Sequence, residues 1–235
     1  MSWFPEYTIE SAPAGSRRFM VATRDHLGYL PAATARWAAS PHLLEGFAKL
    51  NAIFEHGTLD PVAREVVVMT IATRNGCHVC MAMHTARLTA LGAPPDVIAA
   101  LRGALPLGDE RLEAIRVFTL RVLDTAGDVG DDALAAFPAS GYTRQHALEV
   151  VLGIGTYTMS TLANRLTDAP LDDQLSAFAE GWRGGRDGSG RSIGAAAGTR
   201  DRRAGVVERK VSFGSDVGGH EAGVARSADV EDAEA

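Results

Sequence analysis

The chain has 235 residues, of which 46% are hydrophobic, 22% charged and 6% aromatic, with 25 Gly, 10 Pro and 2 Cys. This composition supplies enough apolar surface for a folded core and excludes a chain that is disordered throughout. A formal net charge of -6 excludes a broad basic surface that gathers nucleic acid, and two cysteines are too few for a disulfide-stapled secreted scaffold. We therefore expect no nucleic-acid partner.

No segment is apolar for long enough to cross a membrane. The longest uncharged apolar stretch near the middle of the chain, 66–73, is much shorter than the ~20 residues of a spanning helix. The N-terminal segment contains early acidic residues and has neither a continuous apolar run nor a basic leader, unlike a secretory signal. The sequence therefore predicts a cytoplasmic protein without a membrane partner.

Composition divides the chain into two parts near residue 181. Residues 181–235 hold 12 of the 25 glycines, together with 9 basic and 9 acidic residues. Such a segment buries too little apolar surface to offset the entropy of ordering it, so we expect a disordered tail at 182–235. The net negative charge belongs to residues 1–181, which we expect to form one helical domain.

Apolar residues between 41 and 180 recur at the three- and four-residue steps of helices. Asp60 and Pro61 are a typical helix start and open a segment that is apolar on nearly all sides, which we expect at the centre of the fold. Gly57 stands at a C-terminal cap position of the preceding helix, and Gly76 interrupts the central one. Because strand alternation and internal repeats are absent from the sequence, the predicted fold class is all-α. The helices expected are 41–57, 61–75, 77–92, 96–102, 109–126, 131–137, 143–163 and 171–180.

Reactive side chains concentrate between residues 65 and 84. Cys80 follows Cys77 by three positions and His84 follows Cys80 by four, so at ~100° per residue all three lie on one helix face. Cys77 comes directly after Gly76, where unpaired backbone N–H groups and the helix dipole favour a thiolate. A dithiol beside an imidazole can attack a peroxide or a disulfide and close a disulfide of its own. The pattern therefore favours thiol redox chemistry.

Other interpretations of these residues stay open. A Cys-x-x-Cys pair with a histidine can bind zinc, although the chain has no second pair of this kind. Free cysteines are also common as small core residues, and His84 could be a buried histidine with a hydrogen-bond partner. Glu65 could serve the dipole of the preceding helix, pair with an arginine, or approach His84 if the two helices bend or cross.

The pattern E-x11-C-x2-C-x3-H, formed by Glu65, Cys77, Cys80 and His84, resembles the alkylhydroperoxidase D-like branch of the carboxymuconolactone decarboxylase superfamily. The resemblance covers most of residues 30–180, with a motif core at about 41–125, and excludes the tail. It implies an all-helical fold, a homo-oligomer (trimer or hexamer) and the reduction of hydroperoxides through a dithiol to disulfide cycle. It also implies that no cofactor is bound and that a dithiol electron-donor protein, lipoyl-bearing in the resembled peroxidase, restores the thiols.

The resemblance further implies a catalytic role for each residue of the motif. Cys80 would be the peroxidatic nucleophile, and Cys77 would resolve it as a disulfide. His84 would take the thiol proton through a water, and Glu65 would polarise that relay. The helix-start argument, in contrast, makes Cys77 the more acidic thiol.

One position departs from the pattern of the prototype peroxidase. The prototype has a histidine directly before the second cysteine, where this chain has Val79. His78 is rotated by ~100° from that position on a helix and is not an obvious substitute. This departure argues against full peroxidase efficiency.

Two other functions stay as alternatives. One is a decarboxylase or lactone reaction like that of the superfamily's namesake, a branch that does not depend on a Cys-x-x-Cys pair. The other is a non-catalytic redox sensor that uses the dithiol as a switch.

Residues that select the substrate are not assigned by the sequence. Trp37, Tyr157 and Asn164 are candidates only because bulky or polar groups on otherwise apolar helices need partners.

Overall fold

The computed structural model describes residues 3–179, all of which lie in one compact unit. The predicted tail, 182–235, lies outside the described residues. Every regular element in residues 3–179 is a helix, which confirms the all-α fold class. In chain order the elements are α1 (Ala14–Leu27), α2 (Ala32–Trp37), α3 (Pro41–Glu55), α4 (Pro61–Asn75), α5 (His78–Ala90), α6 (Pro95–Arg102), α7 (Glu110–Thr125), α8 (Asp131–Ala139), α9 (Arg144–Leu166) and the 3-10 helix η1 (Asp173–Phe178).

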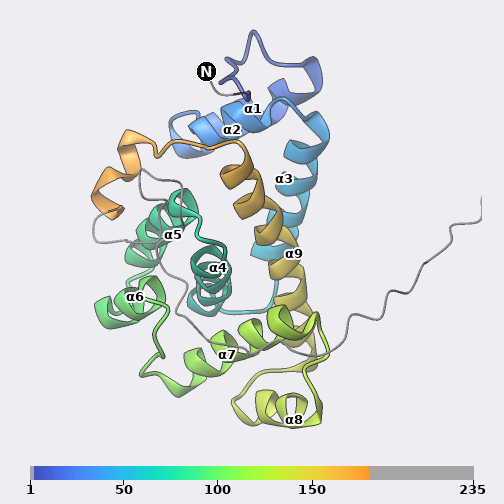
Figure 1. Ribbon diagram of the computed structural model, residues 1–235, viewed down its shortest axis with the longest axis vertical. Coiled ribbons are helices and arrows are strands. Elements are labelled where there is room, and N and C mark those ends of the chain that lie inside the picture. The colour runs from blue at the N-terminus through green and yellow to red at the C-terminus, as the bar shows by residue number, and fades with distance from the viewer. Residues whose placement is uncertain (1–2, 180–235) are drawn as a thin grey trace, which may run out of the picture. The chain divides into compact units, whose positions relative to one another are not determined.

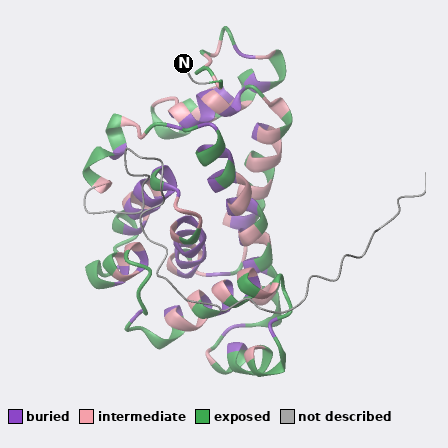
Figure 2. Ribbon diagram, in the orientation of Figure 1, coloured by how far each residue is buried: buried purple, intermediate pink, exposed green. Residues whose placement is uncertain are grey.

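Helix α4 lies at the centre of this unit (Figure 1). Asp60 caps it by accepting a hydrogen bond from the backbone N–H of Ala63 at 2.9 Å, and Pro61 occupies its first turn. The helix packs against α5, α6, α7 and α9, and it is buried along most of its length (Figure 2). Contact on several sides explains why this segment is apolar almost all round, as the sequence predicted.

Two glycines end helices for different reasons. Gly76 adopts a left-handed conformation with φ 64°, so it turns the chain out of α4 as predicted. Gly57 is not a left-handed cap, contrary to the expectation, because α3 ends at Glu55 and is capped by His56. A Cβ at residue 57 would lie 3.1 Å from Oε2 of Glu149, so close approach of that carboxylate explains the glycine.

The N-terminal region and the last element differ from the predicted helices. Helices α1 and α2 precede residue 41, where the sequence predicted none. They are stabilised by packing on α3 and by Ser16, whose buried hydroxyl donates to the carbonyl of Ala38 at 2.8 Å. The α-helix predicted at 171–180 is a short 3-10 helix instead. Asp172 precedes it without capping it, because its carboxylate accepts from the N–H of Ala32 at 2.9 Å.

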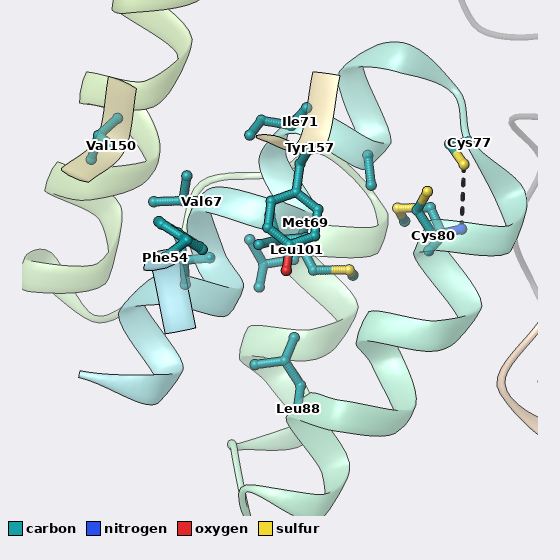
Figure 3. Packing of buried hydrophobic residues seen from close by; sticks show 14 of the residues in the cluster. Phe54, Val67, Met69, Ile71, Cys77, Cys80, Leu88, Leu101, Val150 and Tyr157 are labelled. Atoms are coloured by element: carbon teal, nitrogen blue, oxygen red, sulfur yellow. Dashed lines mark hydrogen bonds between the residues drawn. The ribbon is translucent and has the colours of Figure 1, made fainter. Parts of the chain in front are cut away.

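Helix α9 is the longest element, with 23 residues, and packs against α3, α4 and α7. Tyr157 from this helix joins Phe54 of α3 and Val67 of α4 in the buried core shown in Figure 3. Both cysteines belong to the same buried cluster. Among the described helices, none combines the length and the hydropathy that a membrane span requires.

Candidate active site

The two cysteines stand at the start of α5. Cys77 is the N-cap residue, and its sulfur accepts a hydrogen bond from the backbone N–H of Cys80 at 3.3 Å (Figure 3). The left-handed turn at Gly76 delivers Cys77 to this position. Both cysteines are free thiols, with 1% and 5% of their surface exposed. The dithiol therefore occupies the positively polarised end of a helix and is shielded from bulk water.

The two thiols ionise as a pair, and Cys77 loses its proton first. The pKa of Cys77 lies below its ordinary value because its sulfur accepts hydrogen bonds from the Cys80 thiol, the Cys80 N–H and Asn164, although burial opposes this. The pKa of Cys80 lies well above its ordinary value because its thiol donates to Cys77 and because it is buried. Cys77 is thus the more acidic thiol of the pair, and Cys80 keeps its proton to higher pH.

Asn164 on α9 contributes a donor to both sulfurs. Its Nδ2 lies 3.3 Å from Sγ of Cys80 and 3.6 Å from Sγ of Cys77. The residue is buried, and its Oδ1 has no hydrogen-bond partner in the described part of the chain. The sequence marked Asn164 only as a polar group on an apolar helix, and the fold identifies the two sulfurs as its partners.

His84 connects the cysteine helix to Glu65 on α4. Its Nδ1 lies 2.7 Å from Oε2 of Glu65, and Oε1 of the same carboxylate lies 2.9 Å from Nε of Arg87. Because an ionised carboxylate only accepts hydrogen bonds, Nδ1 carries the proton and Nε2 is left as the basic nitrogen. The sequence left open whether Glu65 pairs with an arginine or approaches His84, and the structure shows both contacts.

Arg87 is the site residue that sequence reasoning missed. It follows His84 by three positions on α5, and this spacing was the available signal that the two share a helix face. Its guanidinium also forms an ion pair with Glu55 of α3, and the Glu55 carboxylate lies 3.6 Å from the guanidinium of Arg64. The network therefore joins α3, α4 and α5, and its members could not be identified from one helix alone.

Tyr157 packs edge-on against the His84 ring, with ring centroids 5.2 Å apart. Its hydroxyl donates to Oδ1 of Asn51 at 2.8 Å, and burial raises its pKa, as do nearby carboxylates. Tyr157 therefore stays a neutral phenol, and its ring positions the imidazole of His84. Trp37 instead packs edge-on against Phe47, at 5.3 Å between ring centroids, within the core.

The position of the missing relay histidine is part of the core. Val79 is 1% exposed and contributes only apolar contacts. His78 is exposed and interacts with Asp168 and the backbone of Ala169, beyond the end of α9; partial desolvation of its ring lowers its pKa. Within residues 3–179, no group of three or more His, Cys, Asp or Glu side chains is placed to hold a metal ion.

Residues 32–120 match the model of the Carboxymuconolactone decarboxylase family. The matched segment contains all four residues of the motif, Glu65, Cys77, Cys80 and His84. No curated protein matches the chain.

Two solved structures share the fold of this chain. One is the alkylhydroperoxidase AhpD core, an uncharacterized peroxidase-related protein from Ralstonia eutropha JMP134. It is 19% identical to this chain, with a TM-score of 0.67, and the match covers 76% of this chain and 96% of that chain. The other, an uncharacterized peroxidase-related protein from Silicibacter sp. TM1040, is 16% identical, with a TM-score of 0.62, covering 74% and 92%. The resemblance of the motif to the alkylhydroperoxidase D-like branch of the carboxymuconolactone decarboxylase superfamily agrees with the family match over residues 32–120 and with the fold that these two structures share.

Proposed function

We propose that the protein is a thiol-dependent peroxidase that reduces hydroperoxides through a dithiol to disulfide cycle of Cys77 and Cys80. The observation that carries the proposal is the buried, proton-sharing pair of free thiols at the start of α5, with the His84–Glu65 pair behind it. The two structural relatives are described as peroxidase-related proteins, which supports a hydroperoxide as the substrate class.

The proposed cycle has three balanced steps. In the first, the Cys80 thiolate attacks the terminal oxygen of the hydroperoxide, an S–O bond forms, the O–O bond breaks, and the alkoxide takes a proton and leaves as an alcohol. In the second, the Cys77 thiolate attacks the Cys80 sulfenic acid, an S–S bond forms, and hydroxide leaves as water after taking a proton. In the third, an external dithiol reduces the disulfide and is itself oxidised to a disulfide.

The ionisation order of the pair gives each group a task in this cycle. Cys80 holds its proton at rest, so its attack requires a base to accept that proton. His84 follows it by one helical turn, and the contact of Nδ1 with Glu65 leaves Nε2 for this purpose. The more acidic Cys77 then supplies the thiolate that resolves the sulfenic acid.

The electron donor and the assembly of the protein follow from the family resemblance. We propose that the reductant is a dithiol protein, with a lipoyl-bearing partner as the candidate, and that no metal or organic cofactor takes part. We also propose a cytoplasmic homo-oligomer, a trimer or hexamer, which light scattering of the full chain would test.

The first experiment is peroxide consumption with dihydrolipoamide as reductant. Wild type should turn over, whereas Cys77→Ser and Cys80→Ser should lose nearly all turnover, because each removes one sulfur of the disulfide. Dimedone, which traps sulfenic acids, should label Cys80 in the Cys77→Ser variant after one equivalent of peroxide.

Three results would contradict the proposal in different ways. Equal turnover in wild type and both variants would exclude the dithiol cycle. Dimedone labelling of Cys77 in Cys80→Ser, with Cys77→Ser unreactive, would reverse the roles of the two cysteines. Sub-stoichiometric oxidation of wild type with a change in assembly would instead indicate a redox sensor.

A carboxymuconolactone decarboxylase-type reaction is the second candidate, since the matched family bears that name. It predicts turnover of carboxymuconolactone that survives alkylation of both thiols. A thiol peroxidase predicts the opposite sensitivity, so one alkylated sample assayed with both substrates separates the two functions.

A further inference from the structure

We propose that Asn164 binds the hydroperoxide: its Oδ1 accepts the O–H of the terminal peroxide oxygen, while its Nδ2 holds the sulfur of Cys80. The inference rests on the proposed peroxidase function. It adds a substrate-binding group from α9 that the E-x11-C-x2-C-x3-H motif does not contain.

The first observation is the unequal use of the Asn164 side chain. Its amide nitrogen is shared between the two sulfurs, at 3.3 and 3.6 Å, but its carbonyl oxygen has no partner among the described residues. The residue is 6% exposed, so bulk water does not freely solvate that oxygen. A buried polar atom without a hydrogen bond costs about 1–3 kcal/mol and is rare in native proteins. An unsatisfied acceptor beside two reactive sulfurs therefore points to a donor that arrives with the substrate.

The second observation is that the Asn164 amide is held in register with the cysteines. Asn75, next to the turn that precedes Cys77, donates from Nδ2 to the hydroxyl of Thr161 on α9 at 2.8 Å. The guanidinium of Arg165 also contacts the carbonyl of Asn75. These contacts on both sides of Asn164 fix α9 against the start of α5. The amide is thus pre-positioned at the sulfurs rather than dependent on a flexible loop.

The terminal oxygen of a hydroperoxide matches this arrangement chemically. It carries one hydrogen, which can donate to Oδ1, and it is the atom that the Cys80 thiolate attacks. When the S–O bond forms and the O–O bond breaks, that hydrogen stays on the oxygen of the sulfenic acid, so the hydrogen bond to Oδ1 persists through the step. The proton that the leaving alkoxide needs comes from His84. A dialkyl peroxide has no such hydrogen, and the site should discriminate against it.

The test compares two kinds of electrophile, hydroperoxides and an alkylating agent, on the fully reduced chain in a single turnover. Hydrogen peroxide and cumene hydroperoxide carry the O–H group, whereas iodoacetamide reports only on the availability and reactivity of the thiolate. In Asn164→Leu, thiol oxidation by both peroxides should slow about 10- to 100-fold relative to alkylation by iodoacetamide, as expected for a lost hydrogen bond to substrate. Thr156→Val is the matched control, because Thr156 is buried on the same helix and, within residues 3–179, its hydroxyl bonds only the carbonyl of Leu152, at 2.8 Å. It should leave both rates at the wild-type level.

The outcomes separate this inference from the proposed function. An equal loss with peroxides and iodoacetamide in Asn164→Leu would overturn it, because Asn164 would then act on the sulfur alone. Wild-type peroxide rates in that variant would overturn it while the peroxidase function stands. Wild type that is alkylated but not oxidised by either peroxide would overturn both. Thermal unfolding checks that each variant folds, and Asn164→Ala, which removes the same oxygen without added bulk, repeats the comparison if the leucine is not tolerated.

Discussion

The carboxylate of Glu65 has two partners that keep it in place beneath the dithiol helix. It is 1% exposed, and its two oxygens accept from His84 and from Arg87. A buried carboxylate is costly unless it is hydrogen-bonded and paired with a cation. We therefore interpret Arg87 as a positioning residue that keeps Glu65 directed at Nδ1 of His84. This contact also keeps Nε2, the basic nitrogen of His84, directed away from Glu65.

Replacing Arg87 tests this role. Arg87→Met should slow thiol oxidation by hydrogen peroxide about 10-fold, since a charge-assisted hydrogen bond is worth about 1.5–3 kcal/mol. Arg87→Lys keeps the cation and should recover part of the rate. Stopped-flow measurement of thiol loss gives both values.

Arg64→Met is the matched control for that prediction. It removes a guanidinium that contacts Glu55 but leaves Glu65 untouched. It should lower the melting temperature without slowing oxidation. Equal slowing by Arg64→Met and Arg87→Met, or full activity of Arg87→Met, would contradict a role that acts through Glu65.

At the scale of elements, α9 serves the core and the site from the same buried face. Gly153 lets this helix approach α3 and α4, because a Cβ there would lie 2.7 Å from Cε2 of Phe54 and 3.2 Å from Cγ1 of Val67. Tyr157, one turn later, contacts His84, and Asn164 contacts the sulfurs. The close approach at Gly153 therefore sets how far the functional side chains of α9 reach.

Gly153→Ala should destabilise the fold by about 1–3 kcal/mol, because the ring of Phe54 is fully buried and cannot yield without repacking. Gly155→Ala is the control on the same helix, since a Cβ there meets nothing within 4 Å. It should stabilise the fold by about 0.5–1 kcal/mol through the better helix propensity of alanine. Urea unfolding measures both, and a Gly153→Ala variant as stable as Gly155→Ala would show that α9 can shift freely.

At the scale of the whole helical unit, a few polar contacts join segments that are distant in the chain. The carboxylate of Glu149 on α9 accepts from the N–H groups of Thr58 and Leu59, at 2.9 and 3.0 Å, in the connection between α3 and α4. The guanidinium of Arg36 on α2 donates to the carbonyl of Thr167, after α9, at 2.7 Å. These contacts fix the ends of α4 and α9 and so hold the site in place.

The Glu149 contact predicts a pH-dependent part of the stability. Burial favours the protonated form, but the hydrogen bonds from Thr58 and Leu59 outweigh it and lower the pKa of Glu149. A carboxyl group whose pKa is lower in the folded state stabilises the fold above its unfolded pKa of about 4.3 and loses this contribution as the pH falls through the folded value. Glu149→Gln should therefore cost about 1–3 kcal/mol at pH 7, with a smaller difference from wild type below about pH 4.

Urea unfolding of wild type and Glu149→Gln at several pH values checks this dependence. Glu45→Gln is the control, because the carboxylate of Glu45 forms surface ion pairs with Arg18 and Lys49. It should change stability much less at every pH. A pH-independent difference for Glu149→Gln would mean that its charge does not contribute.

The features that the sequence predicted correctly depend on residues close together in the chain. Asp60 and Pro61 start α4, and Gly76 ends it, because capping and left-handed turns involve neighbouring backbone groups. The helical positions of Cys80 and His84 on α5 follow from the same local periodicity. The elements that the sequence did not predict correctly depend instead on residues far apart in the chain. Helices α1 and α2 pack against α3, and η1 replaces the predicted α-helix where Asp172 bonds a residue 140 positions away.

The sequence by itself determined the all-helical class, the central helix and a dithiol with an imidazole one turn beyond it, because these follow from side-chain periodicity and capping. Only the tertiary structure decided that Glu65 meets His84 and Arg87, and that Asn164 reaches both sulfurs. Asn164 is separated from Cys80 by 84 positions in the sequence and from Cys77 by 87 positions. Such distances depend on how α4, α5 and α9 pack, and packing follows from the shape of the whole buried core rather than from any one segment.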